Sequence, residues 1–325
     1  MKLIAVEEHL LTPEVRAAWA DPTSAPDPAS AFDAGEIGRR LEDLGEERLR
    51  LMDEAGVDVQ VLSLTTPGLH NVASDRAVDL ARRINDHIAD VVRRHPGRFQ
   101  GFAALPTSAP DEAPRELERA VHDLGLKGAM LSGRTRERNL DHQDFRPLLE
   151  RAAMLGVPLF IHPQVPQQAV CEALYTGISP QVDLALSAYG LGWHYEAGVQ
   201  FVRLVAAGVF DRLPGLQIIL GHWGEVVLFY LERLAALDRA AGLQRRVAEV
   251  ARENLYITAS GMFSEAYLRR CFEIVGPDRL LFSTDYPYQY RPGRQARGFL
   301  DGVPLDETDR AKFAHGNWER LTGSS

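Results

Sequence analysis

The stretch "DFRPLLERAAMLGVPLFIHP", residues 144–163, contains the unit from which we expect the fold to be built. Apolar residues recur at helical spacing up to Leu155, which predicts an amphipathic helix. Gly156 then ends the helix, and a short apolar run over residues 158–164 follows as a strand. Helix, glycine and strand in this order form the junction of a repeated β/α fold.

Short apolar runs of this kind recur along the chain, and amphipathic segments separate them. The runs cover residues 3–9, 57–66, 99–106, 126–133, 158–164, 216–224, 255–261 and 280–287. They are continuously apolar rather than alternating, as expected for parallel strands that are covered on both faces. Eight such units predict one α/β domain over residues 1–325, a (β/α)8 TIM barrel. A doubly wound open sheet is the alternative.

Two stretches interrupt this rhythm and predict insertions after strands one and five. Residues 12–36 are rich in Pro, Ala and Asp, and we expect them to form a long loop. Residues 163–193 form the second insertion. Long insertions in a compact domain are more often functional than accidental.

The composition narrows the class of protein. The formal net charge is −9 and no Lys/Arg-rich block occurs, which disfavours a nucleic acid or an anionic membrane as partner. The two cysteines, Cys171 and Cys271, have no metal-binding or redox spacing and fit reduced thiols. The N-terminus lacks the pattern of a signal peptide, and no apolar run is long enough to span a bilayer. We therefore expect a cytoplasmic protein without a membrane or nucleic-acid partner.

Titratable side chains gather where four of the predicted strands end. They are Glu7, Glu8 and His9 in the first strand, His162 in the fifth, His222 in the sixth and Asp285 in the eighth. The carboxyl ends of barrel strands converge on one face, where barrel enzymes have their active sites. The pattern therefore predicts a common site at that face.

Strand alternation indicates which of these side chains converge. Glu7 and His9 are two positions apart and face the same side, whereas Glu8 faces the other and is expected to pack behind the site. With His162 and Asp285 they form a set of imidazoles and carboxylates that suits one divalent Zn or Mn ion. Taken singly, each residue could be an ordinary packed, capping or turn residue. Their coincidence at strand ends favours the metal site.

At this level of detail the sequence resembles the amidohydrolase superfamily. The resemblance is carried by "VEEH" (6–9), "LSLTTPG" (62–68), "LDHQDFRPLLERAAMLGVPLFIHP" (140–163), "GVFDRLPGLQIILGHWGE" (208–225), "ASGMF" (259–263), "LLFSTDYPY" (280–288) and "HGNWERL" (315–321). More narrowly, the chain is similar to the ACMSD-related branch, which holds metal-dependent aromatic-acid decarboxylases such as γ-resorcylate and 2,3-dihydroxybenzoate decarboxylase.

The resemblance implies nonoxidative decarboxylation of a small aromatic acid, an ortho-hydroxybenzoate, with Asp285 protonating the ring carbon that bears the carboxylate. It also implies one metal ion held by Asp285 together with Glu7, His9 and His162. Many amidohydrolases begin instead with His-x-His and bridge two metals through a carboxylated lysine at the end of strand four. Here Lys127 lies near the start of that strand, which favours a single ion.

Further site residues follow from the same resemblance. His222 is placed like a family histidine that contacts substrate and forms a relay, here with Glu225 and Arg233. The alternatives are a carboxylate that favours a helix N-terminus for Glu225 and a surface ion pair for Arg233. Relatives are usually dimers or tetramers, so a homodimer or homotetramer is expected.

The substrate is less well defined than the metal site. Ser132, Trp193 and Tyr288 are candidates for contacts with substrate, although aromatic residues near strand ends are as often plain packing. Ser132 stands where the known decarboxylases commonly carry asparagine, and Tyr288 replaces a phenylalanine. A mononuclear metal hydrolase of a lactone or amide, with Asp285 as general base, is the alternative enzyme. A catalytically inactive barrel that serves as a binding protein is a third possibility.

Overall fold

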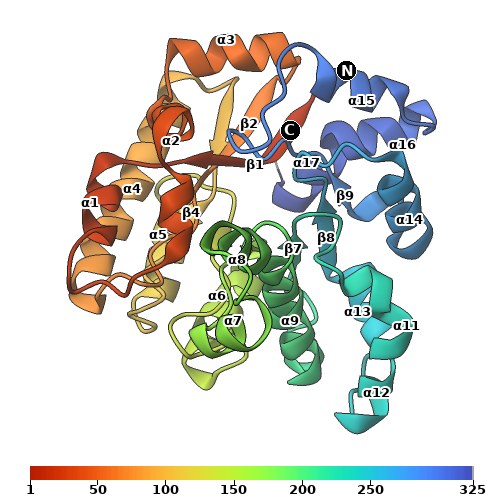
Figure 1. Cartoon of the computed structure of the whole chain (residues 1–325). Coiled ribbons are helices and arrows are strands. Elements are labelled where there is room, and N and C mark those ends of the chain that lie inside the picture. Colours follow the sequence, from red (N-terminus) through yellow and green to blue (C-terminus); the bar gives the residue numbers. More distant parts are fainter. Residues whose placement is uncertain (324–325) are drawn as a thin grey trace.

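The computed structural model describes residues 1–323 and shows a ring of short parallel strands surrounded by helices (Figure 1). The strands are β1 (Ile4–Leu10), β2 (Val59–Leu64), β3 (Phe99–Gly101), β4 (Ala103–Ala104), β5 (Ala129–Leu131), β6 (Leu159–Ile161), β7 (Ile218–Leu220), β8 (Leu255–Thr258) and β9 (Leu280–Leu281). They pair in parallel in two sheets, of order β1-β2-β3 and β4-β5-β6-β7-β8-β9. Each predicted apolar run contains a strand.

Backbone hydrogen bonds join the two sheets on both sides. Phe102 separates β3 from β4, and its N–H donates to the carbonyl oxygen of a β2 residue at 2.8 Å, so β3 and β4 are parts of one barrel strand. At the other side, the N–H of Val6 donates to the Phe282 carbonyl at 3.0 Å and that of His9 to Tyr286 at 2.7 Å. These bonds connect β1 to the segment after β9. The structure therefore confirms the predicted (β/α)8 barrel and not the alternative, a doubly wound open sheet.

Helices fill the connections between the strands. The α-helices are α1 (Pro13–Trp19), α2 (Gly35–Glu42), α3 (Glu46–Ala55), α4 (Ser74–Arg94), α5 (Ala113–His122), α6 (Arg146–Leu155), α7 (Gln168–Leu174), α8 (Pro180–Ser187), α9 (Gly192–Ala206), α10 (Val209–Arg212), α11 (Leu231–Leu234), α12 (Ala236–Ala240), α13 (Val247–Glu253), α14 (Glu265–Val275), α15 (Gln295–Gly302), α16 (Glu307–Ala311) and α17 (Asn317–Thr322). Shorter 3-10 and π turns are η1 (Pro28–Phe32), η2 (Gln143–Phe145), η3 (Val227–Tyr230), η4 (Pro277–Arg279) and η5 (Lys312–Gly316). Gly156 ends α6 in the left-handed conformation, with φ of 65°, as the sequence predicts.

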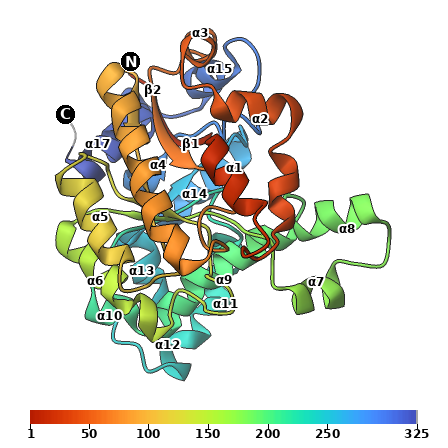
Figure 2. The ribbon, with the colours of Figure 1, turned by 90° about the vertical axis from the view of Figure 1, so that its left-hand side faces the viewer.

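The two insertions lie where they were predicted, but the first is not a loop. It contains α1, η1 and the start of α2, because Thr12 and Asp27 cap helical turns that begin with proline. The second insertion contains α7 and α8, which extend from the body of the molecule in Figure 2. Both insertions begin after strands whose carboxyl ends lie on the face that carries the predicted site.

The inside of the barrel forms its own apolar cluster. It consists of Ile4, Val6, Val59, Val61, Phe102, Met130, Phe160, Ile219, Tyr256, Leu281 and Trp318. A larger cluster lies between the strands and the surrounding helices. Among residues 1–323, none of the helices combines the length and the hydrophobicity that a bilayer-spanning helix needs.

Candidate active site

An irregularity in β1 turns the first predicted ligands into the barrel. Val6 belongs to the interior cluster, so strict alternation from it would turn Glu7 outward. The register of β1 against β2 shifts between Ala5 and Glu8, and after the shift Glu7 and His9 both lie inside. Glu7 and His9 thus share a side, as their spacing predicts. They face the barrel interior because of the register shift, which the sequence does not reveal.

Glu8 packs on the opposite side of the strand. Its carboxylate accepts hydrogen bonds from the Thr284 N–H at 2.8 Å, the Thr284 hydroxyl at 2.6 Å and Gln60 Nε2 at 3.0 Å. Burial raises the pKa of Glu8 to about 7. Glu8 therefore ties β1 to β2 and to the segment after β9, behind the site.

The Glu7 carboxylate is held by one oxygen only. Oε2 accepts hydrogen bonds from the hydroxyls of Thr258, at 2.8 Å, and of Ser260, and Ser283 Oγ lies 3.4 Å away. Oε1 has no hydrogen-bond partner within residues 1–323, although Glu7 is fully buried. Burial raises the pKa of Glu7. The hydroxyls fix the carboxylate so that Oε1 is presented to the barrel mouth.

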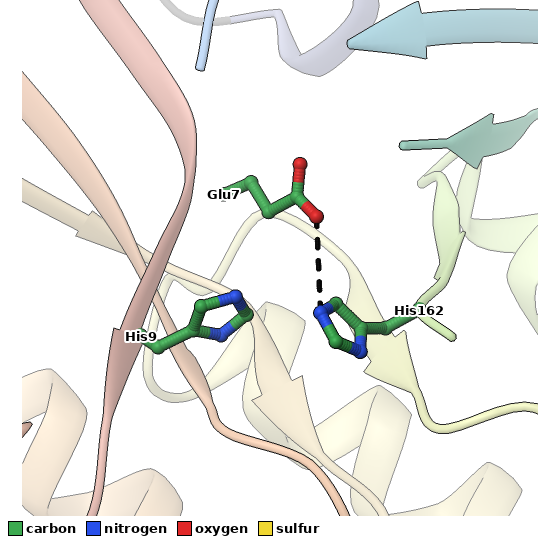
Figure 3. A group of neighbouring side chains, drawn as sticks. All are labelled: Glu7, His9 and His162. Carbon is green, nitrogen blue, oxygen red and sulfur yellow. Dashed lines mark ion pairs between the residues drawn. The ribbon is translucent and has the colours of Figure 1, made fainter. Parts of the chain in front are cut away.

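His9 and His162 point their Nε2 atoms toward the same space as Glu7 (Figure 3). His162 Nε2 lies 3.8 Å from Glu7 Oε1, and its Nδ1 lies 2.9 Å from the Pro163 carbonyl oxygen, which can only accept. His162 therefore carries its proton on Nδ1, and its Nε2 lone pair faces inward. Burial holds the pKa of His162 well below its usual value, so the ring is neutral. His9 Nε2 lies 3.2 Å from Asp285 Oδ1.

These donors fit a divalent cation. Glu7 Oε1 is a buried polar atom without a hydrogen-bond partner in the described part of the chain, and His9 Nε2, although 3.2 Å from Asp285 Oδ1, makes no well-aligned hydrogen bond there. Leaving such atoms unpaired costs about 1–3 kcal/mol each, so they call for a further partner. Imidazole nitrogens and carboxylate oxygens converging from different strands are the ligands that Zn and Mn ions accept. Backbone or hydroxyl bonds on the outer atoms of Glu7 and His162 orient them as metal ligands usually are.

A second group of side chains centres on the carboxylate of Glu225. Its Oε1 lies 2.6 Å from His222 Nδ1, and its Oε2 lies 2.8 Å from His194 Nδ1. Burial disfavours the charge on Glu225, but the two imidazoles outweigh this and lower its pKa to about 2. Burial likewise lowers the pKa of His222, and Glu225 overrides it and raises the value to about 10. The result is a buried ion pair beside the candidate metal ligands.

The backbone that carries these groups is locally strained. Left-handed φ values occur at His222 (44°), Trp223 (57°), Glu225 (49°), Val226 (64°), Ser260 (42°) and Asp285 (55°). Residues other than glycine adopt this region at a cost, and such residues cluster at functional sites. The strain turns the side chains at the ends of β7, β8 and β9 toward one another.

A cavity of about 880 Å³ opens onto this set of side chains. Trp193 and Tyr288, two of the predicted substrate contacts, line it. Ser132 is outside the lining found among residues 1–323, because its hydroxyl lies against Gly68 in the loop after β2. Arg233 is exposed on α11, and within the described residues no ion pair or hydrogen bond joins it to Glu225. Within the described part of this single chain, His194 rather than Arg233 contacts Glu225.

The structure adds site residues that the sequence did not single out. His194, in α9, lies with Nδ1 2.8 Å from the Glu225 carboxylate. Asp33 is fully buried in the first insertion and accepts a hydrogen bond from the Tyr288 hydroxyl, which also lies 2.6 Å from Thr65 Oγ1. Their sequence context gave no signal, since neither follows a predicted strand.

Known proteins are similar to this chain in sequence and in fold. The sequence profile of the amidohydrolase family matches residues 9–323. The chain belongs to the amidohydrolase family. This amidohydrolase is 35% identical to a γ-resorcylate decarboxylase of Polaromonas sp. (strain JS666), over 98% of this chain and 97% of the relative.

Solved structures agree with the sequence relationship. A 2,6-dihydroxybenzoate decarboxylase from Rhizobium superimposes with a TM-score of 0.84 at 32% identity, over 99% of each chain. A 5-carboxyvanillate decarboxylase from Novosphingobium aromaticivorans, complexed with manganese and 4-hydroxy-3-methoxy-5-nitrobenzoic acid, gives a TM-score of 0.90 at 30% identity, over 99% of this amidohydrolase and 96% of that chain.

Proposed function

We propose that this amidohydrolase is a metal-dependent nonoxidative decarboxylase of an ortho-hydroxybenzoate-type aromatic acid. The observation that carries the proposal is the convergence of Glu7, His9 and His162, with Asp285 beside His9, at the mouth of a barrel. Decarboxylases that resemble the chain over nearly its whole length support the same reaction. They favour it over the alternative, hydrolysis of a lactone or amide, and over an inactive binding protein.

Glu7, His9, His162 and Asp285 would hold one divalent ion, Mn or Zn. A manganese-bound relative supports manganese. When bound, the ion would supply Lewis-acid stabilisation of the negative charge on the carboxylate and phenol oxygens of the substrate.

Asp285, partly released from the ion, supplies the proton in this scheme and regains one from solvent after each turnover. It transfers the proton to the ring carbon that bears the carboxylate, so that this carbon becomes tetrahedral and the ring loses its aromaticity. The bond between ring and carboxylate then breaks, its electron pair returns to the ring, and CO₂ leaves. The Asp285 side chain is largely buried, at 9% exposed, and faces the cavity.

His222 and Glu225 position the substrate. The Glu225 carboxylate holds His222 with a 2.6 Å hydrogen bond at the edge of the cavity, where the imidazole can bind an anionic or hydroxyl group of the ring. Trp193 and Tyr288 offer aromatic walls from two different elements. Arg233 and Ser132 remain predicted contributors; the exposed position of Arg233 would bring it to a site only through a neighbouring subunit.

A homodimer or homotetramer in the cytoplasm is also proposed. Exposed apolar side chains on the second insertion and on η3 support assembly. They include Leu174, Ile178, Tyr189, Leu191, Phe229 and Tyr230. The two cysteines are unpaired, as in reducing compartments.

The reaction is tested by incubating manganese-loaded protein with a panel of ortho-hydroxybenzoates and measuring CO₂ release and formation of the phenol. We expect equal amounts of both products from at least one acid. Lactones and aryl amides serve as the comparison panel. Turnover of that panel alone would replace the decarboxylase with the hydrolase.

A further inference from the structure

We propose that the acid decarboxylated in this cavity carries an extended apolar substituent, which lies against Trp223, Leu228 and Met262. The inference rests on the proposed decarboxylation and specifies its substrate class. A volume of about 880 Å³ is typical of sites for drug-sized ligands, roughly 300–1,000 Å³, and exceeds what a single benzoate ring fills.

The walls of the cavity are divided by polarity. Asp285, His162 and His222 lie at the barrel mouth, where the strands end. One part of the wall, between the segment after β7 and α14, is apolar and is formed by Trp223, Leu228, Met262 and Cys271. We call this part of the cavity the apolar arm. An occupant that reaches the reacting groups and also fills the arm needs one polar end and one apolar end.

The apolar arm is a built surface rather than a gap between flexible side chains. Trp223 Nε1 donates a 2.8 Å hydrogen bond to the Met262 carbonyl, and Cys271 Sγ lies 3.7 Å from the Trp223 carbonyl oxygen. These contacts join the β7 loop to the loop before α14. Trp223, Leu228 and Cys271 are 7%, 4% and 3% exposed, so the wall is fixed by the core behind it.

The chemistry of the apolar arm disfavours a polar substituent. Its four residues carry no ionised side chain, since burial raises the pKa of the Cys271 thiol to about 12, and the charge of Glu225, which also lines the cavity, is paired with His194 and His222. The Trp223 N–H is already used by Met262. A hydroxyl or carboxylate placed there would lose water without gaining a partner, whereas an alkyl or aryl group would gain free energy by leaving water.

The rim adds one charge at the outer end. Arg270 of α14 lines the cavity mouth, is exposed, and lies 3.8 Å from Glu273. Tyr267, one helical turn before it on α14, is 50% exposed. Since Arg270 stands in water, it leaves the inner arm apolar, and an apolar group that entered the arm would meet the Tyr267 ring at its outer end.

The experiment measures kcat/KM of the manganese-loaded protein for salicylates that carry hydrogen, methyl, propyl or pentyl at each free ring position. At one ring position we expect kcat/KM to rise roughly fourfold per added methylene, which corresponds to transfer of a CH₂ group out of water. Met262→Trp, which fills the arm, should lower the ratio of pentyl to unsubstituted kcat/KM at least tenfold. Met262→Leu, of similar volume, should preserve that ratio.

The outcomes separate the inference from the function beneath it. If salicylate is decarboxylated but kcat/KM is flat or falls with chain length at every position, the substituent is excluded and the decarboxylase stands. If every acid in the series is inert, the proposed function fails and the inference fails with it. A wild-type profile that rises with chain length supports the inference even if Met262→Trp does not fold.

Discussion

His194 Nδ1 lies 2.8 Å from the one oxygen of the Glu225 carboxylate that His222 does not use. An ionised carboxylate only accepts hydrogen bonds, so both imidazoles donate through Nδ1. His194 is itself held through one contact of Nε2, which either donates to the Tyr189 carbonyl oxygen at 3.1 Å or accepts from Trp193 Nε1–H at 3.3 Å. The second insertion and α9 thus help to fix the orientation of Glu225 and, through it, of His222 at the candidate site.

Replacing His194 tests this arrangement. His194→Ala should lower kcat/KM for the aromatic acid roughly tenfold, because a buried carboxylate oxygen loses its donor at a cost of about 1–3 kcal/mol. His194→Asn, whose amide nitrogen can take the place of Nδ1, should keep most of the activity. Steady-state kinetics of both variants decide, and an alanine variant as active as wild type would remove His194 from the site.

Asp285→Asn should reduce kcat by roughly 10²- to 10⁴-fold, since an amide cannot transfer the proton to the ring carbon. The thermal unfolding midpoint should change little. Asp301→Asn, an exposed aspartate on α15, is the matched control and should keep full activity. Retained turnover in Asp285→Asn would assign the proton to another group.

Glu7 and Glu8 offer a comparison between neighbours on opposite faces of one strand. Glu7→Gln should bind manganese at least tenfold more weakly, because it loses the charge of the Oε1 atom that faces His162. Glu8→Gln should retain the metal, since that carboxylate bonds to Thr284 and Gln60 instead. Elemental analysis of the folded variants at limiting manganese measures the difference. Equal metal content would contradict the ligand assignment.

Asp33 should make stability depend on pH. Burial raises its pKa from 3.8 to about 7. Because the pKa of Asp33 is higher in the folded state than in the unfolded state, its protonated form stabilises the fold. This stabilisation is complete at pH below the unfolded-state pKa and is lost as pH rises through the folded-state pKa. Relative to Asp33→Asn, wild type should therefore lose unfolding free energy, on the order of 4 kcal/mol, between about pH 4 and pH 7. Chemical denaturation of both proteins across this range checks it, and a difference independent of pH would refute it.

The barrel could be predicted because parallel strands that are covered on both faces leave continuous apolar runs, and β/α junctions such as the one at Gly156 repeat. The first insertion was mispredicted because its Pro and Asp content suggests a loop, while Thr12 and Asp27 use those prolines to begin helical turns. Local capping outweighed composition there.

Some residues of the candidate site could likewise be predicted from the sequence, and others could not. Glu7, His9 and His162 lie at strand ends, so the barrel geometry alone predicts that they meet, and the structure brings them together. His194 and Asp33 come from insertions whose path is set by tertiary packing, and no periodicity in the sequence reports it. The register shift in β1 also leaves no periodicity in the sequence and could not be predicted from it.

The most direct test is a titration of metal-free protein with manganese, followed by CO₂ release from the aromatic acid. The metal-free protein should be inactive, and activity should rise in proportion to bound manganese and level off at about one ion per chain, in keeping with a single set of ligands. Undiminished CO₂ release by metal-free protein, or none at full manganese occupancy with every acid of the panel, would contradict the account.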